Sequence, residues 1–290
     1  MSWSALAWAV CLTSNPAWSQ SSPVFSSSIE VVRVDVSVTR DGRPVEGLKA
    51  ADFEVKDNGV LQAVEVVGGS DKPVDAVLAL DVSSSVAGQP LQQLKSAAHA
   101  LLDVLRPEDA ISLLTFSDRI LLQVSPADSR ERAHAAIDGT EAQLTTALYD
   151  ATYAALAAAD PARGRPLVLI FSDGQDVGSW LKPEQVLRAA EASELVVHAV
   201  LSRREGTEVA FLQDLVASTG GHVWRADLGT LREVMLGALD EFRARYTLQY
   251  ERQGGTADGW HKLQVEVRSA GARIRARRGY WQRTPRPSAR

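Results

Sequence analysis

Residues 76–85, with the sequence AVLALDVSSS, place one carboxylate and three hydroxyls directly after a short apolar run. Five consecutive apolar residues are typical of a strand buried on both faces of a parallel sheet. In extended backbone, alternate side chains point the same way, so we expect Asp81, Ser83 and Ser85 to converge on one point. Oxygen ligands that carry little negative charge suit Mg²⁺, which keeps several waters in an octahedral shell. The stretch therefore predicts a strand that ends at a metal site.

Two later segments fit the same point. Thr146 lies in TTALYDA, residues 145–151, where a helix is expected to begin, and Asp173 follows an expected strand in LIFSDG, residues 169–174. Each has an ordinary alternative, because Thr145 or Thr146 could cap the helix and an Asp-Gly pair is a common turn. Their placement favours a site, since open α/β sheets bind ligands at the carboxyl ends of their strands. We expect this site to lie on a loop surface outside the core, so that Asp81→Ala leaves the fold intact.

Together, Asp-x-Ser-x-Ser, the helix-opening Thr and the strand-ending Asp resemble the metal-ion-dependent adhesion site of von Willebrand factor type A (VWA) domains. The resemblance implies that Ser83 and Ser85 bind the ion directly and that Thr146 binds it directly or through water. It implies that Asp81 and Asp173 act mainly through bridging waters and through bonds that orient the hydroxyls. Many relatives have glycines before the metal Thr, whereas Leu144 and Thr145 precede it here, so either Thr145 or Thr146 faces the ion.

The resemblance also implies a cofactor and a partner. The ion would be Mg²⁺, with Mn²⁺ or Ca²⁺ as alternatives. Because few carboxylates touch it, the ion stays electrophilic and takes an exposed Asp or Glu of a protein ligand as its directly bound anion. The expected function is therefore metal-dependent adhesion or protein–protein binding without catalysis.

From residue 74 to about residue 244, short apolar or β-branched runs alternate with helical patterns. The expected strands are residues 76–80, 111–116, 167–171, 195–201 and 222–225. This alternation predicts an α/β fold, a doubly wound and mainly parallel sheet with helices on both faces. The first helix has an apolar stripe from Leu91 to Leu105 and ends before Pro107. Residues 120–124 would supply the antiparallel edge strand found in VWA sheets.

Both flanks of this region predict β structure. Val32, Val34, Val36 and Val38 alternate with polar residues, and the pairs at 41–42 and 58–59 are turn signals. Alternation returns at residues 246–250, 263–267 and 273–275. Residues 45–59 and 276–280 resemble the flanks of exported bacterial VWA-related proteins, which implies a VWA domain inserted in a β-rich module. The expected division is a signal peptide at 1–19, a β-rich segment at 20–70, the VWA domain at 71–244, a C-terminal β segment at 245–282 that would pair with 20–70, and a tail at 283–290.

The first residues predict export to the periplasm or the exterior. An apolar stretch around Cys11 is too short to span a bilayer, and residues 17–19 provide small side chains for cleavage before Gln20. No Lys or Arg precedes this stretch, so the alternative is a start further upstream. Cys11 is the one cysteine of the chain, and we expect no transmembrane segment.

Two other functions, hydrolysis and binding to nucleic acid or an acidic surface, are alternatives. A hydrolase could use the same metal or a Ser/His pair, but the five His residues are scattered and neither His-Glu-x-x-His nor Gly-x-Ser-x-Gly is present. The C-terminal segment is rich in Arg and could bind nucleic acid or an acidic surface. We expect no nucleic acid, because the net charge is −5 and the sequence pI is about 5.6, and we expect these Arg side chains to lie on a solvated strand face.

Overall fold

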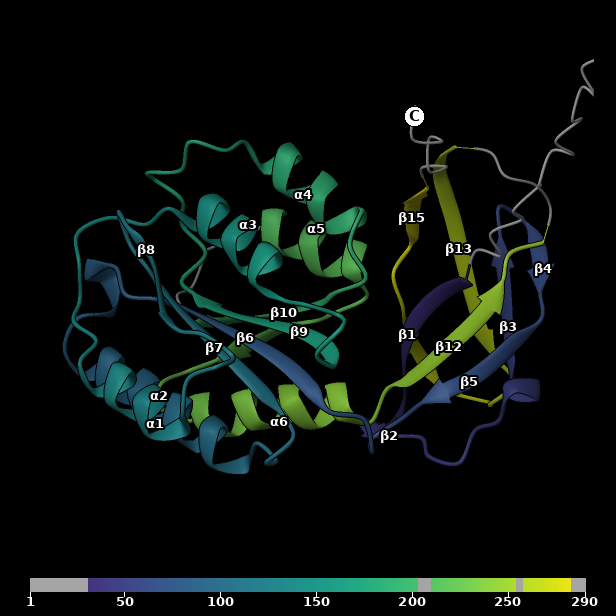
Figure 1. Cartoon of the computed structure of the whole chain (residues 1–290), viewed down its shortest axis with the longest axis horizontal. Helices are drawn as coiled ribbons and strands as arrows, with labels where there is room; N and C mark the ends of the chain where they lie inside the picture. The colour runs from purple at the N-terminus through teal and green to yellow at the C-terminus, as the bar shows by residue number, and fades with distance from the viewer. Residues whose placement is uncertain (1–30, 203–209, 254–257, 283–290) are drawn as a thin grey trace, which may run out of the picture.

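The computed structural model describes residues 31–202, 210–253 and 258–282. The predicted signal peptide at 1–19 and the tail at 283–290 lie outside these ranges. The chain forms a helix-covered sheet and a separate β-rich module side by side (Figure 1). In the described ranges no helix combines the length and the apolar character needed to cross a membrane.

The helix-covered sheet has six strands in the order β11-β10-β9-β6-β7-β8. Its strands are β6 (Val74–Asp81), β7 (Ala110–Phe116), β8 (Ile120–Val124), β9 (Arg165–Ser172), β10 (Val196–Ser202) and β11 (Val223–Ala226). All neighbours pair in parallel except β7 and β8, which are antiparallel. The predicted doubly wound sheet and its antiparallel edge strand are both confirmed.

Six helices cover the two faces of this sheet. They are α1 (Gln89–Val104), α2 (Arg130–Asp138), α3 (Leu148–Ala158), α4 (Pro183–Glu191), α5 (Ala210–Thr219) and α6 (Leu231–Arg243). Side chains of α1, α2 and α6 pack with Leu78 and Leu80 on one face, and side chains of α3, α4 and α5 pack with Val77 and Ala79 on the other (Figure 1). Strand β6 is therefore apolar at every position between its first and last carboxylates because helices bury both of its faces.

The β-rich module consists of two antiparallel sheets. One has the order β14-β1-β12-β5 with β2 beside β1, and the other has the order β15-β13-β3-β4. Their strands are β1 (Val31–Arg40), β2 (Arg43–Pro44), β3 (Phe53–Asp57), β4 (Val60–Gln62), β5 (Val64–Gly68), β12 (Tyr246–Glu251), β13 (Gly259–Val267), β14 (Arg273–Arg275) and β15 (Gly279–Gln282), with a short 3₁₀ helix, η1, at Ala50–Asp52. Val31–Val36 of β1 pair with Tyr246–Glu251 of β12, so segments from before and after the helical region share one sheet.

The core of this module follows the alternation in the sequence. Val32, Val34, Val36 and Val38 are all buried against residues of both sheets. At the end of β3, the Asp57 carboxylate accepts hydrogen bonds from the hydroxyls of two tyrosines, 250 and 280, and these residues belong to opposite sheets. A buried carboxylate needs such donors, and here they tie the two sheets together.

The two turn pairs form hairpins as predicted. Asp41 and Gly42 both have positive φ, at 51° and 77°, and connect β1 to β2. Asn58 and Gly59, with φ of 47° and 84°, connect β3 to β4. Positive φ at both central residues is the type I′ turn, whose twist matches that of the flanking strands.

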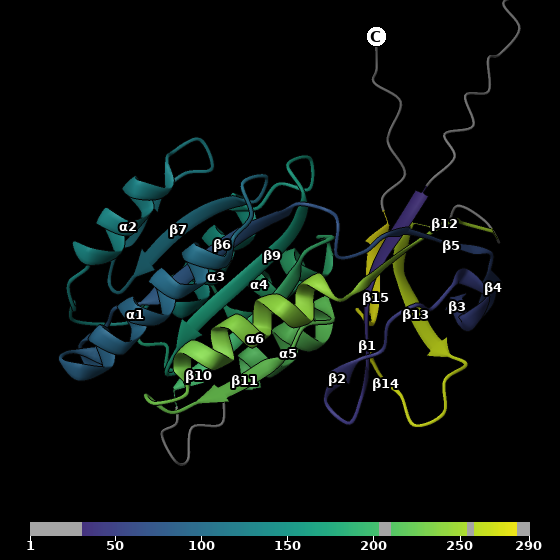
Figure 2. The same cartoon turned by 90° about the horizontal axis from the view of Figure 1, so that it is seen from below.

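The chain passes between the two parts at one end of the helix-covered sheet. It enters β6 after β5 and returns to β12 after α6. Figure 2 shows the arrowheads of β9 and β11 pointing away from the β-rich module. The carboxyl ends of the parallel strands, where the predicted site lies, are therefore at the far end of the molecule.

Candidate metal centre

Asp81 is the last residue of β6, and its carboxylate is buried within a set of donors. One oxygen accepts the backbone N–H of Ser83 at 2.9 Å, and the other accepts the Ser172 hydroxyl at 2.7 Å. Ser172 is the last residue of the neighbouring strand β9 and itself accepts the backbone N–H of Gly174. Two strand ends thus hold this carboxylate in one orientation.

Ser83 and Ser85 come together as expected, but through a different backbone than expected. Their hydroxyl oxygens are 3.0 Å apart, so both face the same point. The chain is not extended through this motif, because Ser84–Val86 form a short 3₁₀ helix, η2. The Ser84 hydroxyl turns to the carbonyl of Leu144 instead. The 3₁₀ turn, and not the alternation of an extended strand, therefore brings the two hydroxyls together.

Thr146 is buried, whereas Thr145 is exposed. The carbonyl of Thr146 accepts the backbone N–H groups of Val177 and Gly178, both at 2.9 Å, so the loop after β9 wraps around it. Neither Thr caps a helix, because Ala147 is the N-cap of α3 and gives no side-chain bond. The first free N–H groups of α3 are instead satisfied by Asp176 and Ser179.

Asp173 follows β9 directly, and one of its oxygens accepts the backbone N–H of Gln175 at 3.1 Å. Its charge is felt by Asp81. Burial raises the pKa of Asp81, the bonds from Ser83 and Ser172 lower it, and the charge of Asp173 raises it again. Two carboxylates thus share one buried region of the carboxyl edge.

Burial corrects one expectation. Asp81, Ser83, Thr146 and Asp173 are all no more than 5% exposed, so these residues belong to the packed edge of the sheet and not to a loop surface. Replacing Asp81 by Ala would leave the Ser172 hydroxyl and the Ser83 N–H without their acceptor, which costs stability. The expectation that the site is a loop surface outside the core is therefore wrong, and we now expect Asp81→Ala to lower stability.

The donor set fits a hard divalent cation. It combines paired hydroxyls with two buried carboxylates. Burying two negative charges close together is unfavourable, and a bound cation would offset this free energy. Among the described residues no group of three His, Cys, Asp or Glu side chains is placed to hold a metal. Ligation by oxygen atoms and water is the chemistry of Mg²⁺ or Mn²⁺ sites.

A cavity of about 170 Å³ adjoins this region. It is lined by residues that follow β6 and β7 and by the segment before Thr146, including Val82, Ser117, Arg119, Thr140 and Gln143. The carboxyl edge is therefore hollowed beside the candidate metal residues.

The histidines are less scattered than the sequence indicated. His99 of α1 and His134 of α2 meet with their Nδ1 atoms 2.7 Å apart, and the Nε2 atom of His99 lies 2.9 Å from an oxygen of Asp138. This contact links two helices on the outer face and is a structural pair.

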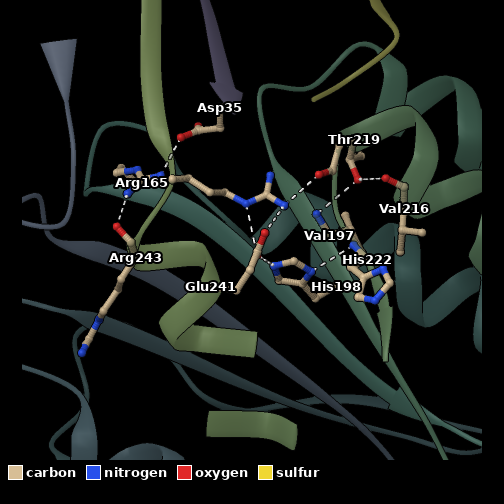
Figure 3. Close-up of polar contacts among 11 residues, drawn as sticks. Asp35, Arg165, Val197, His198, Val216, Thr219, His222, Glu241 and Arg243 are labelled. Atoms are coloured by element: carbon tan, nitrogen blue, oxygen red, sulfur yellow. Dashed lines mark hydrogen bonds and ion pairs between the residues drawn. The ribbon is translucent and has the colours of Figure 1, made fainter. Parts of the chain in front are cut away.

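A second group is centred on His198 of β10, in the region drawn in Figure 3. His198 is buried, accepts the backbone N–H of His222 at Nδ1, and has Nε2 2.9 Å from an oxygen of Glu241. Burial lowers the pKa of His198. Burial raises the pKa of Glu241, but the bond from His198 and the charge of Arg245 outweigh this, and the net pKa is lowered. His198 is therefore a packed structural residue, as the sequence predicted.

The Arg-rich C-terminal segment is not uniformly solvated. Arg277 is buried, donates to the carbonyl of Ser193, and stacks over the ring of Tyr280. Arg273 and Arg278 are exposed. The expectation of a solvated Arg face is thus wrong at Arg277, because this side chain joins the β-rich module to the end of α4.

Residues 76–175 match the family model of the von Willebrand factor type A domain. The matched segment begins in β6, contains all five candidate metal residues, and lies on the sheet order described above. The chain contains a VWA domain. Domains of this family often mediate metal-dependent protein–protein interactions.

Known proteins resemble the chain over parts of their length. Human inter-alpha-trypsin inhibitor heavy chain H6 is 26% identical over 152 residues, which are 47% of this chain and 12% of that protein. The mussel byssus proximal thread matrix protein 1, in a structure described with a zinc-occupied MIDAS motif, has a TM-score of 0.54 at 20% identity and covers 64% of this chain and 49% of its own. A von Willebrand factor type A structure from Catenulispora acidiphila has a TM-score of 0.51 at 14% identity and covers 89% and 75%. These structures share the fold.

Proposed function

We propose that the chain is a metal-dependent protein-binding module that works outside the cytoplasm and performs no turnover. The observation that supports this most is the meeting of Ser83 and Ser85 hydroxyls beside two buried carboxylates at the carboxyl edge of a VWA sheet. Such an edge is where open α/β sheets bind ligands.

In this proposal Ser83, Ser85 and Thr146 hold the ion, and Asp81 and Asp173 orient these ligands and any bridging waters. The bonds to Asp81 already fix its two oxygens, one toward the Ser83 backbone and one toward Ser172. A bound divalent ion would supply an electrophilic centre for one Asp or Glu side chain of a protein partner. Burial of most of this set limits motion of the ligands before binding.

We propose binding without catalysis because the polar groups at the site are hydrogen-bonded to one another. The hydroxyls bond to each other and to carboxylates or backbone groups, and His198 lies within β10, bonded to His222 and near Glu241. A general base must reach the proton that it removes, and these groups are engaged in orienting ligands.

The test is thermal unfolding of residues 20–290 with EDTA and with millimolar Mg²⁺ or Mn²⁺. We expect the ion to raise the melting temperature, because a ligand that binds only the folded state stabilises it by mass action. Ser83→Ala and Ser85→Ala should each reduce the increase. Ser84→Ala is the matched control, since its hydroxyl faces Leu144 and not the site. Equal melting temperatures in EDTA and Mg²⁺ would overturn the proposal.

Export is a separate part of the proposal. We infer that residues 1–19 act as a signal peptide and are removed. Mass spectrometry of the protein from the native cell would detect a chain that begins at Gln20 in the exported fraction. A cytoplasmic chain that retains Met1 would contradict this part and leave the metal site untouched.

A further inference from the structure

Three large apolar side chains are highly exposed around the candidate metal centre. Leu144 is 79% exposed, Val177 is 73% exposed and Trp180 is 95% exposed. Single exposed apolar side chains are ordinary on protein surfaces. These three come from the two loops that carry Thr146 and Asp173, which makes their position informative.

Hydrogen bonds place the backbone of each of the first two residues beside the site. The carbonyl of Leu144 accepts the hydroxyl of Ser84, which lies between the two paired serines. The backbone N–H of Val177 donates to the carbonyl of Thr146. Leu144 and Val177 are therefore each attached by a backbone group to a residue of the metal-binding loops.

Trp180 is held by the same loop. Its backbone N–H and that of Leu181 donate to the two oxygens of Asp150, in the first turn of α3. Asp176 and Ser179 of this loop bond in turn to the first N–H groups of α3. The loop is thus anchored along its length, and its exposed side chains project from a fixed backbone.

Exposed apolar side chains on an anchored loop next to a charged binding site are typical of an interface. Protein–protein interfaces are enriched in aromatic residues at their centre, and one buried Trp there often contributes much of the binding energy. The cation would attract a carboxylate. Burial of the apolar side chains around it is favourable when the partner covers them with apolar surface of its own.

We infer that Leu144, Val177 and Trp180 form an apolar rim that selects the protein partner. This inference rests on the proposed metal-dependent binding. The partner is a protein segment in which an Asp or Glu enters the metal centre and the residues beside it are aliphatic or aromatic. The cation requires the negative charge of the Asp or Glu, and the apolar rim favours aliphatic or aromatic residues beside it.

The test uses three short fluorescent peptides and the chain from residue 20 onward in Mg²⁺. One peptide has a central Asp flanked by Phe and Leu, the second has Ser at both flanking positions, and the third replaces the Asp of the first by Asn. Fluorescence polarisation should show at least about tenfold tighter binding of the first peptide than of either other. The triple variant Leu144→Ser, Val177→Ser, Trp180→Ser should lose the preference for apolar flanks.

Two controls separate the rim from the metal centre. The triple variant should keep the increase in melting temperature caused by Mg²⁺, and Leu61→Ser, an exposed apolar residue of the distant β4, should keep the peptide preference. If Mg²⁺ stabilises the wild type but the peptides bind equally or not at all, the rim inference is wrong. If Mg²⁺ has no effect on the wild type, the proposed function fails first. Loss of the Mg²⁺ effect in the triple variant would also overturn the rim, since these side chains would then be building the site.

Discussion

Arg165, the first residue of β9, donates to the carboxylate of Asp35 on β1 at 2.7 Å (Figure 3). The same Asp35 oxygen accepts the hydroxyl of Thr247 on β12, and the guanidinium lies over the ring of Phe242 at 4.7 Å. Both charged side chains are largely buried. This ion pair joins the VWA sheet to the β-rich module at the point where the chain crosses between them.

Arg165→Met should therefore lower the free energy of unfolding by about 3 kcal/mol, because it leaves the buried Asp35 without its cation. Adding Asp35→Asn should recover part of the loss, a coupling that a double-mutant cycle in urea measures. Arg132→Met is the control, since Arg132 pairs with Asp128 on the surface and is 64% exposed. That variant should change stability by no more than about 0.5 kcal/mol. Equal losses for both Arg substitutions would show that burial of the first pair is unimportant.

Asp81→Asn should separate stability from metal binding. An amide at this position keeps an acceptor for the Ser83 N–H, and its NH₂ group can donate to the Ser172 oxygen in place of the bond that Ser172 now donates, while the repulsion from Asp173 disappears. In EDTA we expect the variant to be as stable as the wild type or more so, by on the order of 1 kcal/mol. In Mg²⁺ it should gain little. Urea unfolding in the two buffers gives both values, and a variant that is weaker in EDTA would contradict this account.

Gly221 should tolerate no side chain. A Cβ atom there would overlap the carbonyl oxygen of Val197, the second residue of β10. Gly221→Ala should thus destabilise the fold by about 3 kcal/mol through overpacking against strand backbone. Gly237→Ala provides the matched control, because it lies inside α6 with open space around its Cβ position and should gain about 0.5–1 kcal/mol. Thermal melts compare the pair, and similar melting temperatures would refute the steric argument.

Stability should fall in mild acid, partly because of His222. Burial lowers the pKa of His222 to about 4, and the charges of Arg275 and His198 act in the same direction. Between the unfolded pKa of about 6.5 and pH 4, the unfolded chain binds a proton that the folded chain excludes, so stability is lost as the pH falls. Because His222 is only partly buried, solvent screening reduces this contribution to less than the roughly 3 kcal/mol that the full pKa shift would give near pH 4.

His222→Gln removes this proton uptake and should make the decline shallower. Urea unfolding at several pH values across this window measures the slope for both proteins. Parallel slopes for wild type and variant would mean that other groups govern the acid response.

The sequence predicted the architecture because its signals are local. Buried parallel strands are continuous apolar runs, the strands of the β-rich module alternate, and Asn58-Gly59 specifies its own turn. The placement of the candidate metal residues at strand ends or just before a helix was also predicted, whereas their role as ligands stays a prediction. Their convergence follows from the sheet order, in which β6 and β9 are neighbours.

Other features had no local signal. The 3₁₀ turn at Ser84–Val86 replaced an extended segment because its conformation depends on bonds to distant loops, such as that from Ser84 to Leu144. The capping of α3 by Asp176 comes from 27 residues away, and Asp35 meets Arg165 across 130 residues. Pairings of this kind depend on tertiary packing, so neither composition nor periodicity could predict them.

The insertion of the VWA domain into the β-rich module has a mechanical consequence. Two polypeptide connections, one from β5 to β6 and one from α6 to β12, reach the module at the end of the sheet opposite the candidate metal centre. A pulling force applied at that centre would run along the parallel strands and then divide between both connections, with the contact of Arg165 and Asp35 lying alongside them. Tension is therefore shared between two covalent tethers, and neither one bears the whole load.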